Sequence, residues 1–340
     1  MKQRQISIEL LRIIAMLMVL IQHANFLALG SPTPECLAEQ PVMECLRILI
    51  QSATIAAVDI FVMISGWFGI KASAKGFAKF MWQVVYIVGL SLVVEYSFGS
   101  TTPSLKDFFR CFGLFSGGGW FVASYIGLYI LSPVLNAFIN SSSIRQHGVI
   151  TLVFLAFEVI FGDTLSVSFI VMGYSTFSFI GLYLLAAFLR RIKDKFTIRG
   201  CLTISLICIV TNTIIYAVAD LFRFIAVRDL VFNYINPLVI IEAASILLLF
   251  DRITPPPKRI SQYISFLSAS CFAVYLLHIG TSEAIGLYLG TIRQLASGYE
   301  NWGVSVLMIV GFNILVFITA IIVDQPRKLI WNKYIGPKFK

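Results

Sequence analysis

The chain has little charge, which excludes a water-soluble globular protein. Only 13% of its 340 residues are Asp, Glu, Lys or Arg, whereas 58% are hydrophobic. A soluble domain carries about 25% charged residues. The apolar runs take up almost the whole sequence, so we expect residues 1–340 to form a single membrane domain with no additional soluble domain.

Histidine and cysteine are also scarce, and their spacing argues against a metal site. The three His and six Cys include no Cys-x-x-Cys pair, so the common zinc-ligand spacing is missing and we expect no metal. Cys36 and Cys45 flank the first predicted outer loop, where an oxidising compartment permits a disulfide; the sequence leaves that pairing open. The glycine-rich segment Ser116–Trp120 fits neither a GxGxxG nor a Walker pattern after a strand, which excludes the usual nucleotide-binding loops.

What the chain does have is a series of long apolar runs. A bilayer span needs about 20 mostly apolar residues, and about ten runs of this kind predict an all-α, polytopic membrane helix bundle. The expected helices cover 8–29, 44–70, 80–98, 119–139, 148–162, 169–190, 201–220, 231–250, 264–290 and 302–324.

The net charge of +9 follows this topology and is not a nucleic-acid footprint. With the N-terminus inside, 19 of the 26 Lys and Arg residues fall in inner segments and six in outer segments. Cytoplasmic loops of membrane proteins are enriched in Lys and Arg. We therefore expect both termini to be cytoplasmic, and no nucleic acid among the partners.

The first two predicted helices carry ionisable groups inside the membrane, where such groups are costly and usually functional. Arg12 and His23 are eleven residues apart, which returns an α-helix to nearly the same face after roughly 16 Å. Asp59 lies at a depth comparable to that of His23. A buried carboxylate needs a partner, so we predict that Asp59 interacts with Arg12 or His23.

These residues belong to a set of motifs that resembles the acyltransferase-3 family of integral membrane acyltransferases. Each motif is short, but together they cover the chain in the expected order. They are Glu9 with Arg12 and His23, Val58–Gly66 (VDIFVMISG), Trp120–Phe121, Tyr125–Pro133 (YIGLYILSP), Tyr275–His278 (YLLH) and Asp324–Arg327 (DQPR).

The resemblance implies ten helices in a bacterial cytoplasmic membrane and transfer of an acyl group, commonly acetyl, from cytoplasmic acyl-CoA. The acceptor is a hydroxyl of an envelope or exopolysaccharide sugar, as a glycan or glycolipid. His23 matches the catalytic histidine of the family, and Arg12 belongs to the same signature. We predict an O-acyltransferase in which His23 is the general base and Asp59 orients it or balances Arg12.

The donor side departs from the family pattern. Many members carry an Arg-x-x-Arg pair after the Ser-Gly segment, where this chain has Lys71, Lys75 and Lys79. Their spacing predicts one helix face. They form either a strip that binds the phosphates of CoA or ordinary charge near lipid head groups. The second interpretation is favoured, because any cytoplasmic loop is basic. Arg12 is a separate candidate for contact with CoA.

Four further residues are candidate substrate contacts: Ser65, Trp120, Tyr125 and His278. Trp120 and Tyr125 suit stacking on a sugar ring, or a position in the interfacial aromatic belt. Ser65 and Tyr125 are candidates for contacts to the oxyanion or the acceptor. His278 rests on the resemblance alone, which makes it a weaker catalytic candidate than His23.

Four other polar positions, apart from the motifs, each predict one structural feature. Glu158 and Glu242 are intramembrane acids, and Asn236–Pro237 should bend the eighth helix. We expect His147 in a solvated loop.

A transporter is the alternative function. Ten helices with buried His, Asp and Arg also suit a proton-coupled transporter or a flippase of a glycan precursor, although no inverted repeat is visible. For an acyltransferase, the sequence leaves open which hydroxyl is acylated, which acyl chain is transferred and whether the protein is a homo-oligomer. It also leaves open whether transfer is direct, in a ternary complex, or passes through a transient acyl-histidine.

Overall fold

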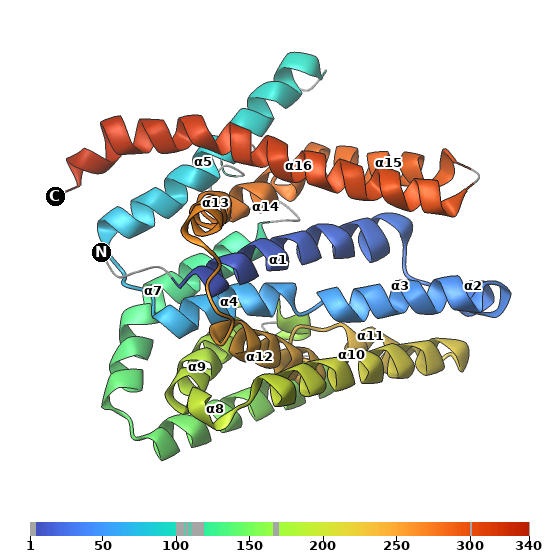
Figure 1. Cartoon of the computed structure of the whole chain (residues 1–340), viewed down its shortest axis with the longest axis horizontal. Coiled ribbons are helices and arrows are strands. Elements are labelled where there is room, and N and C mark those ends of the chain that lie inside the picture. The colour runs from blue at the N-terminus through green and yellow to red at the C-terminus, as the bar shows by residue number, and fades with distance from the viewer. Residues whose placement is uncertain are drawn as a thin grey trace. The chain divides into compact units, whose positions relative to one another are not determined.

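The structure is a computed structural model that describes residues 5–99, 106, 109, 119–165, 170–299 and 301–339 (Figure 1). The described residues form helices and no strand. Each of the ten expected ranges contains a helix, so the chain is an all-α, polytopic membrane protein.

Eight helical segments in the described part are long and apolar enough to cross a membrane. They are Ile6–Ala28, Pro41–Phe68, Ala74–Phe98, Trp120–Ser141, Ile144–Gly162, Ile198–Leu221, Lys258–Ile279 and Trp302–Lys338. The expected sixth and eighth helices are shorter, namely α9 (Thr176–Ile192) and α12 (Pro237–Asp251).

The helices divide into two compact units, each built from separate parts of the chain. Unit 1 comprises the residues up to Ile70 and Leu131–Ser265. Within it, α4 packs against α1, α9 and α12, and α10 lies along α3 and α12 (Figure 1). Its elements are α1 (Ile6–Gln22), η1 (His23–Ala28), α2 (Pro34–Glu39), α3 (Pro41–Thr54), α4 (Ala57–Phe68), the end of α7 (Trp120–Ser141), α8 (Ile144–Glu158), η2 (Val159–Thr164), η3 (Val171–Gly173), α9, η4 (Lys193–Lys195), α10 (Ile198–Leu221), α11 (Ile225–Val231), α12 and most of α13 (Lys258–Ser268).

Unit 2 comprises Lys71–Ile130 and the residues from Phe266 onward. Within it, α14 packs against α5, α15 and α16. Its elements are α5 (Ala74–Phe98), the first half of α7, the end of α13, α14 (Cys271–Ile279), α15 (Ser282–Ser297), α16 (Trp302–Ile330), η5 (Trp331–Ile335) and η6 (Gly336–Lys338).

Two expected helices are interrupted inside the membrane-spanning run. The range 44–70 consists of α3 and α4, with a turn at Ile55–Ala56 between them. The range 264–290 is divided among α13, α14 and α15. Thr281 starts α15, because its hydroxyl oxygen accepts a hydrogen bond from the Ala284 amide at 3.0 Å.

The Asn236–Pro237 pair begins α12, so the expectation that it bends a helix is wrong. The Asn236 side-chain oxygen accepts a hydrogen bond from the Leu238 amide at 2.8 Å. Asn is a favoured N-cap, and Pro fits the first helical position because it lacks an amide hydrogen there. The pair is therefore a start signal.

Candidate active site

In unit 1, α1 pairs Arg12 with an acid of its own helix. Arg12 Nη1 donates to Glu9 Oε2 at 2.7 Å, and Glu9 is buried. Residues three apart on a helix are neighbours, so Glu9 reaches the guanidinium without any change in helix packing. The structure thereby corrects the alternative in which Asp59 balances Arg12.

His23 lies where α1 changes from an α-helix to a π-helix. The α-helix runs without a break from Ile6 to Gln22, and His23–Ala28 forms π-helical turns. Arg12 and His23 therefore keep the shared face that their spacing predicted. His23 is half-buried. Short π-helical stretches are rare and often occur at functional sites.

The π-helical segment is fixed by Arg47 of α3. Arg47 Nε donates to Asn25 Oδ1 at 3.2 Å, and Asn25 Nδ2 donates to the Arg47 carbonyl at 2.8 Å. Arg47 also pairs with Glu44 at 2.8 Å and donates to the Gly30 carbonyl. No local sequence pattern connects Arg47 to the turn after His23, so this contact could not be predicted from the sequence.

Asp59 lies in the first turn of α4 and is fully buried. A carboxylate is favoured there by the helix dipole. Neither of its oxygens accepts a hydrogen bond from the described residues. Because α4 packs against α1, Asp59 belongs to the helix beside His23, although this structure contains no hydrogen bond from His23 to Asp59.

Asp59 is one of three buried acids that the fold brings together. Glu158 of α8 is 1% exposed and Glu242 of α12 is 0% exposed, and both interact electrostatically with Asp59. Among the described residues, one oxygen of Glu158 and both oxygens of Glu242 have no hydrogen-bond partner. Acids in such surroundings are costly and commonly mark a substrate or proton pathway. The sequence identified each acid singly, but only tertiary packing unites them.

The three predicted donor lysines belong to unit 2 and do not share a helix face. Ser73 caps α5 by accepting a hydrogen bond from the Gly76 amide at 3.1 Å. The helix therefore starts at Ala74, which leaves Lys71 in the segment before it. Lys75 and Lys79 lie on α5, and Lys75 Nζ donates to the Phe339 carbonyl at 3.2 Å.

Trp120 and Tyr125 lie in the first turns of α7, also in unit 2. Tyr125 packs on Phe80 with ring centroids 5.2 Å apart and stacks on Phe121 at 6.0 Å. Trp120 packs edge-on against Phe121 at 5.9 Å. Both rings therefore belong to an aromatic cluster, and their contact with a sugar remains a prediction.

His278 of α14 is buried in unit 2, with its protonation site fixed by the backbone. Its Nδ1 donates to the Val274 carbonyl at 2.6 Å, because a carbonyl oxygen only accepts. In a neutral imidazole the other ring nitrogen, Nε2, is then the acceptor. The ring packs edge-on against Tyr275 and Tyr288.

A comparison with known proteins identifies the family of this chain. A family model described as an acyltransferase domain, acyltransferase-3, matches residues 5–324. The chain belongs to the acyltransferase-3 family. No curated protein and no solved structure matches it.

Two family motifs have structural roles in this acyltransferase-3 protein. In the Ser-Gly segment, Gly66 lies so close to α9 that an added Cβ would be 2.4 Å from the Tyr183 carbonyl oxygen. Glycine is needed there for close helix contact. Its neighbour Ser65 donates to the Phe61 carbonyl at 3.4 Å, and a role of Ser65 toward substrate remains a prediction.

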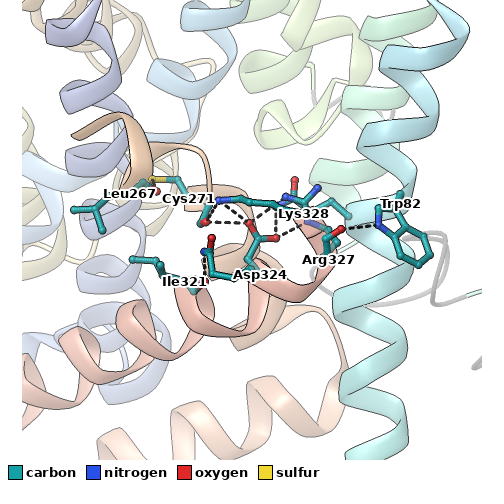
Figure 2. A network of polar contacts seen from close by, with 10 residues as sticks. Trp82, Leu267, Cys271, Ile321, Asp324, Arg327 and Lys328 are labelled. Carbon is teal, nitrogen blue, oxygen red and sulfur yellow. Dashed lines mark hydrogen bonds and ion pairs between the residues drawn. The ribbon is translucent and has the colours of Figure 1, made fainter. Parts of the chain in front are cut away.

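The DQPR motif of the same acyltransferase builds a buried ion pair within unit 2 (Figure 2). Arg327 Nε donates to Asp324 Oδ1 at 2.6 Å, and both side chains are almost fully buried. Ser270 Oγ donates to Asp324 Oδ2 at 2.9 Å, and Lys328 Nζ lies 3.3 Å from that oxygen. Trp82 Nε1 donates to the Arg327 carbonyl at 3.2 Å. The motif therefore connects α5, α14 and α16.

The remaining histidine of the acyltransferase, His147, is fully buried in α8, so the expectation of a solvated loop is wrong. Its Nε2 donates to the Leu184 carbonyl at 3.0 Å, and Arg191 Nη1 donates to its Nδ1 at 3.3 Å. Ser143 starts the helix with a capping box that includes Gln146. That signal is present in the sequence.

Proposed function

We propose that this acyltransferase moves an acetyl group from cytoplasmic acetyl-CoA to a sugar hydroxyl of an envelope or exopolysaccharide glycan. The membrane would be the bacterial cytoplasmic membrane, with both chain termini on the cytoplasmic side. The observation that carries the proposal is the family match over residues 5–324, combined with His23 on the Arg12 face of α1 at the start of the π-helical segment.

The proposed reaction needs a base for the sugar hydroxyl and hydrogen-bond donors for the negative charge that develops on the thioester oxygen. His23 takes the proton of the sugar hydroxyl as its oxygen attacks the thioester carbonyl carbon. The carbon–sulfur bond then breaks, and the proton passes to the departing thiolate of CoA. A neutral imidazole is suited to this step near neutral pH. The sequence and the fold are also compatible with a transient acyl-histidine.

Asp59 is the proposed positioning residue for His23. Catalytic hydrogen bonds are often absent until substrate is bound, so an Asp59 carboxylate without a described partner is available to accept the imidazole N–H in the complex. Arg12, held by Glu9, is proposed to attract the CoA phosphates. Lys71, Lys75 and Lys79 are the further candidates for donor binding, and Ser65, Trp120, Tyr125 and His278 for the acceptor.

The experiment uses the full chain in lipid nanodiscs with acetyl-CoA and a panel of envelope glycans. Thiol release is measured with and without each glycan, and mass spectrometry locates the transferred acetyl group. Acceptor-dependent thiol release with matching acetylation would support the proposal. Folded protein that releases no thiol with any glycan of its own cell envelope would contradict it.

A second candidate, proton-coupled transport of a glycan precursor, is favoured by one observation. Asp59, Glu158 and Glu242 place three acids without a described cation partner inside unit 1, an arrangement also used in proton pathways. Proteoliposomes with a pH gradient distinguish the two functions. A transporter would move labelled glycan in the absence of acetyl-CoA, whereas an acyltransferase would not.

A further inference from the structure

Unit 2 contains a large cavity, and among the candidate residues of the proposed reaction only His278 lines it. Its volume is about 720 Å³, and its walls come from α5, α14, α15 and α16. Ligand sites commonly have volumes of about 300–1,000 Å³. All of its lining residues belong to unit 2, so the cavity is complete within that unit.

Four of the six polar side chains in the cavity wall, Ser91, Glu95, His278 and Tyr288, are hydrogen-bonded within the protein. Ser91 Oγ and His278 Nδ1 each donate to the carbonyl four residues earlier, at 3.1 and 2.6 Å. Tyr288 donates its hydroxyl hydrogen to Asn313 Oδ1 at 2.6 Å. The rest of the wall is mainly Leu, Val, Ala and Phe. Along the apolar wall a sugar would lose most of its hydrogen bonds to water, whereas an alkyl chain has none to lose.

The length of the cavity fits one lipid chain. On α16 the wall runs from Phe312 to Val323, which is roughly 16 Å of helix. On α5 it runs from Leu90 to Gly99, roughly 14 Å. One leaflet is half of a hydrocarbon core of about 30 Å, so the walls match the depth of a chain in a single leaflet.

The rim of the cavity is apolar and exposed. Phe98 is 89% exposed, Leu287 is 74% exposed and Leu315 is 58% exposed, and all three line the cavity. Phe98 and Leu315 belong to two of the membrane-spanning segments, where large exposed apolar side chains face lipid. An occupant can therefore enter sideways from the bilayer.

Two carboxylates line the cavity. Glu95 of α5 accepts a hydrogen bond from Thr281, the residue that caps α15, and Glu283 lies in the first turn of α15. Carboxylates disfavour an anionic head group beside them, which favours a lipid without net negative charge over acyl-CoA as the occupant.

We propose that this cavity is a binding site for one alkyl chain of a bilayer lipid whose head group carries no net negative charge. The proposal does not depend on acyl transfer, because it rests only on the apolar walls of the cavity, its exposed rim and its two carboxylates.

The test uses the full chain in nanodiscs with lipid probes that carry the same photoactivatable alkyl chain. One probe is a phosphatidylethanolamine and another is a phosphatidylglycerol; a photoactivatable acyl-CoA is the third. After irradiation, mass spectrometry maps the labelled peptides. We expect the phosphatidylethanolamine probe to label residues 277–288 and 312–323 above the level of other lipid-facing segments, and the two anionic probes to label them less.

Filling the cavity should abolish that labelling. Ala284 lines the cavity, so Ala284→Trp should bring labelling of both peptides down to the background level. The matched control is Gly286→Trp on the same helix, where an added Cβ meets open space and labelling should persist. If Ala284→Trp does not fold, Val316→Trp fills the cavity from α16. Glu283→Gln should reduce the preference for phosphatidylethanolamine. Labelling that is unchanged in folded Trp variants, or that is strongest with an anionic probe, would overturn the proposal.

Discussion

Gly66 shows how one residue sets a helix contact in unit 1. A Cβ at this position would lie 2.4 Å from the Tyr183 carbonyl oxygen and 2.8 Å from its Cα. Both atoms are backbone, so the helices themselves must move to admit a methyl group. We predict that Gly66→Ala lowers the stability of the protein by about 1–3 kcal/mol, the usual cost of overpacking.

Unfolding in detergent, followed by circular dichroism, measures this change. Gly89→Ala is the matched control, because an added Cβ at Gly89 of α5 has no neighbour within 4 Å and should leave the unfolding midpoint unchanged. Equal midpoints for the Gly66→Ala variant and the unchanged protein would contradict the packing argument.

At the residue scale, the sequence predicted best what depends on helix spacing alone. Arg12 and His23 share a face because α1 is continuous, and that follows from periodicity. The ion pair of Arg12 with Glu9 also follows from helix spacing, because the two residues are three apart. The prediction instead offered Asp59, on another helix, as a partner of Arg12. The burial of His147 and the proximity of Asp59 to Glu242 depend on tertiary packing. No local sequence pattern predicts such packing.

The ion pair of the DQPR motif stabilises the junction of α14 and α16. Removing Arg327 would leave Asp324 buried with only weaker partners, because Lys328 is 3.3 Å away and partly exposed. Breaking a buried pair in this way costs about 3–5 kcal/mol. We predict that Arg327→Met destabilises the protein and that adding Asp324→Asn restores part of the loss. Chemical unfolding in mixed micelles measures the stability of both variants. An Arg327→Met variant as stable as the native protein would contradict this role of the ion pair.

The beginning of α5 provides the test of donor binding. Replacing Lys71, Lys75 and Lys79 with Gln should raise the apparent KM for acetyl-CoA if these charges attract its phosphates, and the effect should shrink at high salt.

The matched control replaces Lys195, Lys258 and Arg259 with Gln, which removes the same charge from inner segments of unit 1. An equal change in KM for both triple variants would support ordinary topological charge and reject the donor strip.

Element boundaries were harder to predict than element existence. Every expected range contains a helix, because long apolar runs are a strong signal. The break at Ile55–Ala56 has no Pro or Gly to announce it. Asn236–Pro237, in contrast, has the features of a cap followed by a first-turn proline, although the apolar pattern continues across it. The shared helix face predicted for Lys71, Lys75 and Lys79 fails at Lys71, because the Ser73 cap begins α5 after it.

At the scale of the whole molecule, the charge distribution predicts both termini in the cytoplasm. Topology reporters fused after Gly99 and after Lys195 should lie on opposite sides, outside and inside respectively, because Lys and Arg accumulate in cytoplasmic loops. Enzymatic activity of paired reporters in each compartment measures this. Two fusions on the same side would overturn the orientation.

The family itself was predictable from six short motifs, since their order along the chain is as specific as their sequences. The division into two units was not predictable, because each unit joins an early and a late part of the chain. The cavity of unit 2 was missed for the same reason, as its walls come from four helices that no single motif spans.

The central claim is that His23 is the base of an acyl transfer. The most direct test is acetyl transfer by His23→Ala in nanodiscs, measured together with CoA binding, with His278→Ala as the matched control. Loss of a general base lowers turnover by roughly 10²–10⁴-fold. We predict that loss for folded His23→Ala with donor binding retained, and a smaller loss for His278→Ala. A folded His23→Ala protein that transfers acetyl at a near-native rate would contradict the account.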